Sequence, residues 1–167
     1  ALYLDTPEAR LDQSSTYSAI QELQMFMEYF PRSERKSEAQ IMIFALQDKL
    51  VLKEYLSAKM YYDLGTYTGN GSMTSDRKIN GNNFLACITT AQNILKDYPY
   101  TSMREDVSIL LLRAKYNLGV ESVQEKIEER MRETIDEYYA FKNEFPDSKY
   151  MKEVEKIFKE ASKYVKD

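Results

Sequence analysis

Apolar side chains recur at fixed distances before three of the four prolines of this 167-residue chain. Four positions upstream of Pro31, Pro99 and Pro146 carry mostly apolar or small residues in all three copies. They are Phe26, Leu23, Ile20 and Ala19; Ile94, Ala91, Ile88 and Cys87; and Phe141, Tyr138, Ile135 and Thr134. Spacings of three, four and seven residues fall on one face of an α-helix. Each set therefore predicts the buried stripe of an amphipathic helix, with Ile135 and Phe141 in the core of the last one.

The three prolines also share their immediate neighbours, in the tetrapeptides FPRS, YPYT and FPDS. An aromatic residue precedes each proline, and a hydroxyl residue follows two places after it. Proline disfavours helix at the residue before it, and Ser and Thr are good N-caps. Pro31, Pro99 and Pro146 are therefore expected to mark points where one helix ends and the next begins.

A second landmark recurs between these prolines, in the tetrapeptides YDLG and YNLG that end at Gly65 and Gly119. Glycine after an apolar helical stretch commonly adopts the left-handed conformation that closes a helix. Gly65 and Gly119 are therefore predicted to cap one helix of a pair before its partner begins.

A helix pair with Gly at its inner turn and Pro at its outer turn is the tetratricopeptide pattern. Pro31 and Pro99 are 68 residues apart, twice the 34-residue tetratricopeptide period. We expect an all-α chain built as a tetratricopeptide-like right-handed superhelix of antiparallel helix pairs, ranked above a plain helical bundle. The predicted helices are 15–30, 33–64, 83–98, 102–118, 122–145 and 148–166.

The expected organisation is one repeat array over 1–167. Residues 1–65 form a third-repeat region with a long linking helix, 83–118 a fourth repeat and 119–167 a fifth. Between them, 66–82 is rich in Gly, Asn and Ser and predicts an inserted loop. The stretch between Gly119 and Pro146 is also longer than a minimal repeat needs, but its extra residues are helical and charged. Helix 122–145 is therefore expected to overhang its neighbours.

Composition narrows the chemistry that this chain can perform. Asp and Glu number 27 and Lys and Arg 23, giving a net charge of −4 and no excess of cations for binding nucleic acid. The chain has no His and one Cys, which removes the usual general base, the nucleophile triads and nearly every zinc site. No apolar run is long enough to span a membrane. We expect no enzyme activity, no cofactor and no metal.

Candidate partner-binding residues lie on the charged part of helix 122–145. They are Glu125, Glu128, Glu129, Arg132 and Glu133, followed by Tyr138 and Tyr139. Mixed charge on a helical extension suits electrostatic recognition of another protein, whereas a solvated face is the structural alternative. The two tyrosines either line a partner groove or fill the core between repeats.

The motif order resembles a known family. Leu11-Asp12-Gln13, Phe30-Pro31-Arg32-Ser33, Ala58-Lys59-Met60-Tyr61-Tyr62, Lys96-Asp97-Tyr98-Pro99 and the stretch 134–150 resemble the tetratricopeptide lipoproteins of the bacterial β-barrel assembly machinery (BamD/ComL type). The resemblance covers nearly the whole chain and aligns it with repeats three to five. The insertion at 66–82 departs from the family pattern.

The resemblance implies a non-enzymatic scaffold at the cell envelope, on the periplasmic face of the outer membrane. Its partners would be the barrel-forming subunit and other assembly lipoproteins, and an N-terminal lipid anchor outside this chain would be its only membrane attachment. The alternative is another envelope or cytosolic tetratricopeptide adaptor that binds a peptide segment of a partner protein.

Overall fold

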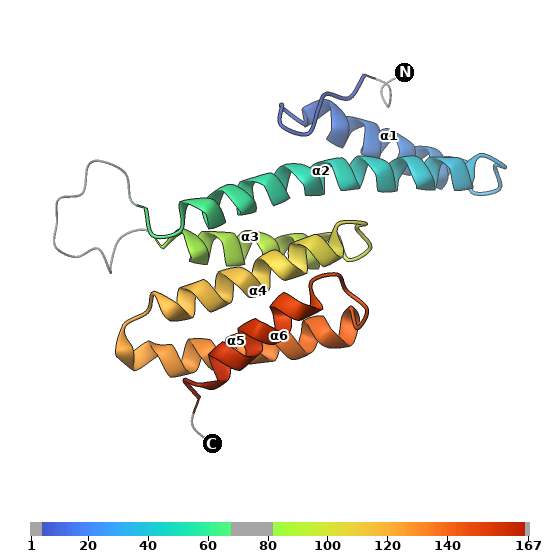
Figure 1. The fold of residues 1–167 in the computed structure, drawn as a ribbon. Helices are drawn as coiled ribbons and strands as arrows, with labels where there is room; N and C mark the ends of the chain where they lie inside the picture. Colours follow the sequence, from blue (N-terminus) through green and yellow to red (C-terminus); the bar gives the residue numbers. More distant parts are fainter. Residues whose placement is uncertain (1–4, 68–81, 166–167) are drawn as a thin grey trace.

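The chain is all-helical in the residues that this computed structural model describes, which are 5–67 and 82–165. Six helices follow one another along the chain and confirm the predicted all-α class (Figure 1). They are α1 (Ser14–Tyr29), α2 (Lys36–Leu64), α3 (Asn83–Asp97), α4 (Arg104–Val120), α5 (Gln124–Glu144) and α6 (Met151–Ser162). The predicted inserted loop at 66–82 lies outside the described residues, apart from Thr66, Tyr67 and Asn82.

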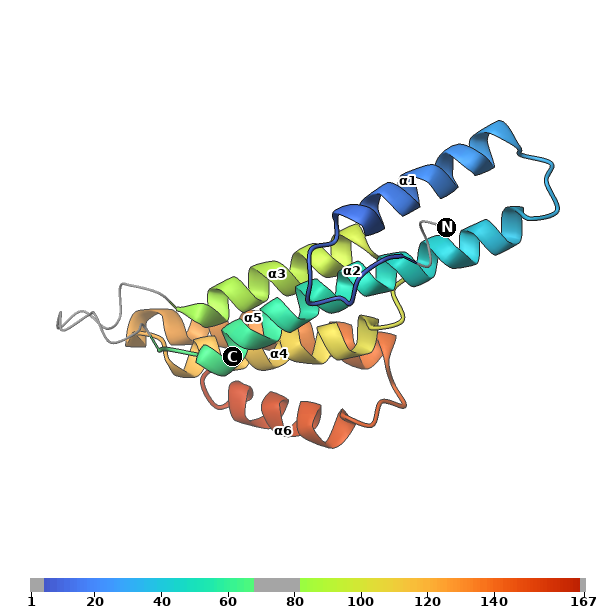
Figure 2. The same ribbon diagram turned by 90° about the horizontal axis from the view of Figure 1, so that it is seen from above.

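The helices stack in chain order, so that each lies against its sequence neighbours (Figures 1 and 2). One apolar cluster joins α1 to α2 through Ile20 and Leu46, and a second joins α2, α3 and α4 around Ala91 and Leu111. A third joins α4, α5 and α6 around Phe141. The helix faces that the apolar periodicity marks therefore meet in a continuous series of small cores.

The three proline turns have nearly the same backbone geometry. The residue before each proline closes its helix at φ −123° and ψ 60° (Phe30), −127° and 65° (Tyr98), and −129° and 62° (Phe145). Each of these residues donates its backbone N–H to the carbonyl four residues earlier. Pro31, Pro99 and Pro146 thus terminate helices as predicted, because α1, α3 and α5 all end two residues before the proline.

The hydroxyl residues of these turns do not cap the following helices as the sequence predicts, but accept hydrogen bonds within the turns that precede those helices. Ser33, Thr101 and Ser148 accept a hydrogen bond from the backbone N–H two residues on, at 3.2, 3.2 and 3.0 Å. The residues that flank the helix starts are Arg35, Met103 and Tyr150, which make no side-chain cap. Helices α2, α4 and α6 consequently begin two or three residues later than their predicted starts.

The two inner glycines differ from each other. Gly65 ends α2 with φ 53° and fits the predicted positive-φ cap. Gly119 lies inside α4 with an ordinary helical φ, so the predicted left-handed cap is wrong there. A Cβ on Gly119 would come within 2.9 Å of the Met131 Cε atom, so this glycine instead permits close approach of α4 and α5.

The buried stripe of α5 lies one position away from Ile135. Met131, Thr134, Tyr138 and Phe141 are buried, with Phe141 only 2% exposed. Ile135 is half-buried, whereas its counterparts Ile20 and Ile88 are both buried. Successive helical residues are about 100° apart, so a stripe through Thr134 and Tyr138 leaves Ile135 at its edge. Ile135 therefore lies at the periphery of the core, whereas the sequence pattern predicts it inside the core.

Helix α2 is much longer than the helices stacked beneath it, and the second pair meets it midway. The turn between α3 and α4 reaches α2 at Asp48, whose carboxylate accepts hydrogen bonds from the side chains of Thr101 and Ser102. The first part of α2 and the adjoining half of α1 consequently extend past α3 and α4 (Figure 2). We call this part, residues 22–47, the projecting end.

Candidate functional site

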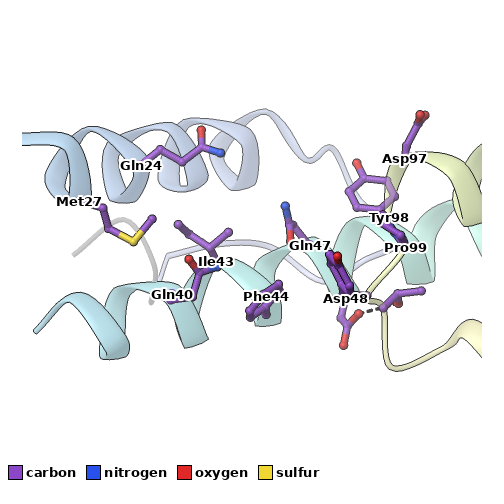
Figure 3. Close-up of a pocket in the computed structure, with 12 residues that line it drawn as sticks. Gln24, Met27, Gln40, Ile43, Phe44, Gln47, Asp48, Asp97, Tyr98 and Pro99 are labelled. Carbon is purple, nitrogen blue, oxygen red and sulfur yellow. Dashed lines mark hydrogen bonds between the residues drawn. The ribbon is translucent and has the colours of Figure 1, made fainter. Parts of the chain in front are cut away.

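A groove of about 370 Å³ opens where the projecting end meets the second proline turn (Figure 3). Met27 of α1 and Ile43 of α2 point toward each other across its floor. Tyr98 and Pro99 close one end of the groove, and Phe44 lies on its α2 side. Ligand sites in proteins are typically concave, largely apolar and of this volume, so the groove is the first candidate for a binding site.

Two of the residues that line this groove, Phe44 and Tyr100, are large exposed apolar side chains, and others are exposed elsewhere on the projecting end. Tyr29, Phe30, Ile41 and Phe44 belong to the projecting end, and Tyr100 belongs to the turn beside it. Tyr100 is 85% exposed, Tyr29 74% and Ile41 69%. Single exposed apolar residues are normal, so the weight rests on Phe44 and Tyr100, which add exposed aromatic surface to the groove itself.

A second cavity of about 250 Å³ lies on the other side of Tyr98. Its walls come from three helices: Tyr17 of α1, Glu54 of α2, and Thr90, Asn93, Ile94 and Asp97 of α3. Tyr98 and Asp97 line both cavities, so the two share a wall. Burial raises the pKa of Tyr98, and the Tyr17 hydroxyl and the charges of Asp97 and Glu54 add to the rise. The second cavity is therefore mainly polar and acidic, whereas the first combines an apolar floor with Gln24, Gln40, Gln47 and two carboxylates in its walls.

The charged candidate residues of α5 lie at the surface of the helix, and we call their carboxylates the acidic face. Glu125, Glu129 and Glu133 are exposed, and Glu128 forms an exposed ion pair with Arg132 at 2.8 Å. These positions are three or four residues apart and share one side of the helix, away from the buried stripe. Because α6 has 12 residues and α5 has 21, the first turns of α5 extend past the end of α6. The charged segment is thus available for contact, although it lies far along the chain from the groove.

The two predicted tyrosines of α5 have different surroundings. Tyr138 is 4% exposed and stacks on Phe158 with ring centroids 4.3 Å apart, while its hydroxyl accepts a hydrogen bond from Lys142. Tyr139 is 51% exposed and places its ring edge against Phe158. Tyr138 thus fits the core-packing interpretation, and Tyr139 is the one that a partner can reach.

Sequence reasoning did not select the residues of the groove, although the sequence contains a signal for them. Residues 41–44 read Ile-Met-Ile-Phe, four apolar residues in a row inside a helix. Since successive side chains point about 100° apart, four in a row cannot all face one neighbouring helix. Ile43 is buried against α1, while Ile41 and Phe44 face outward. An uninterrupted apolar run in a predicted helix was therefore the sign of a second contact surface.

The described residues offer little for bond-making chemistry. No group of three or more metal-type ligands lies together among them. Burial, with a smaller contribution from the charge of Asp63, raises the pKa of the Cys87 thiol to about 12. A thiol of that pKa stays protonated at neutral pH and is a poor nucleophile. Of the helices described, none is long and apolar enough to cross a membrane.

No known protein-family pattern matches this sequence, and no curated protein matches it either. The fold and the two cavities beside Tyr98 therefore carry the functional argument, together with the motif order described above.

Proposed function

We propose that this chain is a protein-binding scaffold made of tetratricopeptide-like repeats. Three turns with the same sequence context and nearly the same backbone angles support an array of repeated units. Helices that pack mainly on their sequence neighbours are the arrangement that repeat proteins use to build extended binding surfaces. In this proposal the helix pairs wind into a right-handed superhelix, and the segments 1–65, 83–118 and 119–167 are successive repeat regions.

The observation that carries the proposal is the groove at the projecting end. It combines a concave apolar floor with exposed aromatic side chains at its margin (Figure 3). Grooves of this type accept apolar side chains of a peptide or a helix, and aromatic residues at their margin supply much of the binding energy. Protein binding accounts for both features without requiring any catalytic group.

The finer proposal is that the scaffold serves outer-membrane β-barrel assembly. The motif order from Leu11 to Tyr150 supports it, since it resembles the assembly lipoproteins over nearly the whole chain. On this proposal the protein works on the periplasmic face of the outer membrane and docks to the barrel-forming subunit, alongside other assembly lipoproteins. It involves no nucleic acid, and attachment to the membrane is through an N-terminal lipid outside this chain.

The acidic face of α5 is the docking contact in this finer proposal. Its carboxylates at Glu128, Glu129 and Glu133 are not needed for the core, and exposed ion pairs contribute about 0–1 kcal/mol each to stability. Charges at the margin of an interface act mainly on specificity and on the rate of association. A positively charged region of the partner would therefore be steered to this face.

Capture of the periplasmic domains of the barrel-forming subunit tests the finer proposal. A triple variant with Glu128, Glu129 and Glu133 changed to Lys should keep its melting temperature and lose capture, most clearly at low salt, where exposed charges are least screened. A matched control reverses three exposed carboxylates outside both the acidic face and the projecting end, Asp5, Glu8 and Asp147, and should capture normally. Equal capture by both triple variants at low salt would exclude α5 as the docking contact.

The second candidate function is a peptide-binding adaptor outside barrel assembly. The groove favours it independently, because a groove can bind a partner segment in any compartment. Selection of peptides on the chain, combined with failure to capture the barrel-forming subunit, would favour the adaptor.

A further inference from the structure

Two carboxylates of the second cavity have no hydrogen-bond or ion-pair partner among the residues that the structure describes. Glu54 on α2 and Asp97 at the end of α3 are exposed, and neither forms an ion pair or hydrogen bond with another described residue. The third carboxylate nearby, Asp48, is already occupied by the hydroxyls of Thr101 and Ser102 at 2.6 Å each. Glu54 and Asp97 thus present negative charge that no residue within 5–67 and 82–165 neutralises.

No Lys or Arg is among the residues that line either cavity. The two lysines of α2 nearest in sequence, Lys49 and Lys53, are turned to the N-terminal segment. Lys49 donates to the Thr6 hydroxyl at 2.6 Å, and Lys53 donates to the Leu11 carbonyl at 3.0 Å. A concave surface lined by one sign of charge concentrates ligand groups of the opposite sign.

Aromatic rings stand beside these carboxylates. Tyr17 and Tyr98 line the same cavity, and the charges of Glu54 and Asp97 act on the Tyr98 hydroxyl. A cation is attracted to the face of an aromatic ring and to a carboxylate at once, and Arg does both better than Lys because its guanidinium is planar and forked. The cavity therefore has the chemical groups that recognise a basic side chain.

The apolar groove begins directly next to this site. Asp97 and Tyr98 belong to both cavities, and Met27, Ile43 and Phe44 lie on the far side of them (Figure 3). A segment that placed a basic side chain beside Glu54 and Asp97 would bring its neighbouring residues over the apolar floor.

We propose that these two cavities together bind one segment of a partner protein, with an Arg or Lys side chain between Glu54 and Asp97 and apolar side chains in the adjoining groove. This inference rests on the proposed scaffold function and names the chemistry of the partner at this site. Arg is the preferred residue, since it can bridge carboxylates while stacking on Tyr17 or Tyr98.

Peptide display supplies the probe, because it samples partner segments of any sequence. A library of random 12-residue peptides is selected on the purified chain, and the selected peptides are then titrated one by one against it. The test variant is Glu54→Gln with Asp97→Asn. The control variant is Asp136→Asn with Glu155→Gln, which removes two exposed charges on α5 and α6 outside any proposed contact.

The expected result is enrichment of peptides that carry Arg or Lys next to apolar residues. Replacing that basic residue by Gln should weaken binding to the native chain about tenfold, which corresponds to about 1.4 kcal/mol. The same replacement should change binding to the E54Q/D97N variant far less, so that the two changes are coupled. Unchanged binding to the control variant shows that the loss is specific to this cavity.

Several results would overturn the inference. Selected peptides without basic residues, or basic peptides that bind the E54Q/D97N variant as well as the native chain, place recognition elsewhere. Failure to select any peptide excludes a segment-binding groove, and self-association abolished by E54Q/D97N would assign the cavity to a second copy of the chain.

Capture of the barrel-forming subunit is measured separately, so the scaffold proposal can stand when this inference fails. Because both side chains are exposed, the melting temperature of E54Q/D97N should match that of the native chain, and Tyr17→Leu gives a second variant of the same site.

Discussion

The carboxylate of Asp48, midway along α2, accepts a hydrogen bond from the hydroxyl of Thr101 at 2.6 Å. The two residues are 53 positions apart in the sequence and join the first helix pair to the second proline turn. The Ser102 backbone N–H and hydroxyl donate to the same carboxylate, so one acidic side chain satisfies three donors. This contact and the apolar cluster of α2, α3 and α4 together fix where the second pair meets α2, and hence how much of α2 is left to form the projecting end.

Replacing Asp48 by Ala should destabilise the chain by about 0.5–1.5 kcal/mol, because the partly exposed donors of Thr101 and Ser102 exchange their protein acceptor for water. Urea unfolding at neutral pH measures this free energy. Asp136→Ala, an exposed carboxylate on α5, is the control and should change stability by less than about 0.5 kcal/mol. Equal effects of the two changes would show that the Asp48 contact does not hold the pairs together.

The two inner glycines should respond differently to alanine. Gly65→Ala should cost about 1–3 kcal/mol, since its φ of 53° is strained for a residue with a Cβ, and that Cβ would lie 3.1 Å from the Phe84 ring. Gly119→Ala should cost less, because its φ is helical and its close neighbour is the movable end of Met131. Thermal melting of both variants tests the difference. A larger loss for Gly119→Ala would contradict the distinct roles described for these glycines.

Phe141 and Ile135 provide a comparison within α5. Phe141→Ala should cost about 3–5 kcal/mol, since it empties a fully buried site between α4 and α6. Ile135→Ala should cost clearly less, because Ile135 stands at the edge of the buried stripe. Chemical denaturation gives both values. Equal losses would restore Ile135 to the repeat core, where the spacing from Pro146 predicts it.

Alkaline pH should destabilise the fold through Cys87. The folded-state pKa of this thiol is about 12, above its ordinary value, so burial favours the neutral form and this stability is complete below the unfolded pKa. It is lost as pH rises from about 8.5 toward 12, with about 2–3 kcal/mol gone at pH 10.5. Urea unfolding at pH 8 and pH 10.5 should show a smaller pH effect in Cys87→Ala than in the native chain. The native thiol should also resist a thiol reagent at pH 8 and react after unfolding.

The ends of several helices could be predicted from the residues next to them in the sequence. The ends of α1, α3 and α5 follow from proline, which acts on its immediate neighbours, and those boundaries lie within one residue of the predictions. The Gly65 cap was predictable for the same reason. The role of Gly119 was not, because it depends on Met131 in the next helix, and a tetrapeptide shared with Gly65 contains no information about that neighbour.

The candidate site depends on contacts between distant residues, which sequence spacing does not contain. Nothing in the pattern showed that Asp48 would receive Thr101, so nothing showed which part of α2 stays uncovered. The sequence predicts a charged surface on the overhang of α5, whereas the structure places more exposed apolar residues on the projecting end than on α5. The run Ile-Met-Ile-Phe at 41–44 was the one local sign of that surface.

The Asp48 contact lies far from the tip of α2, which begins at Lys36. The stretch from Lys36 to Asp48 extends about 18 Å at 1.5 Å per residue. A rotation of about 10° at this contact therefore swings the tip of the helix by about 3 Å, which is comparable to the thickness of an aromatic ring. Any change in the direction of α2 at this contact would therefore be amplified along the groove, whose α2 wall lies between the contact and the tip of the helix.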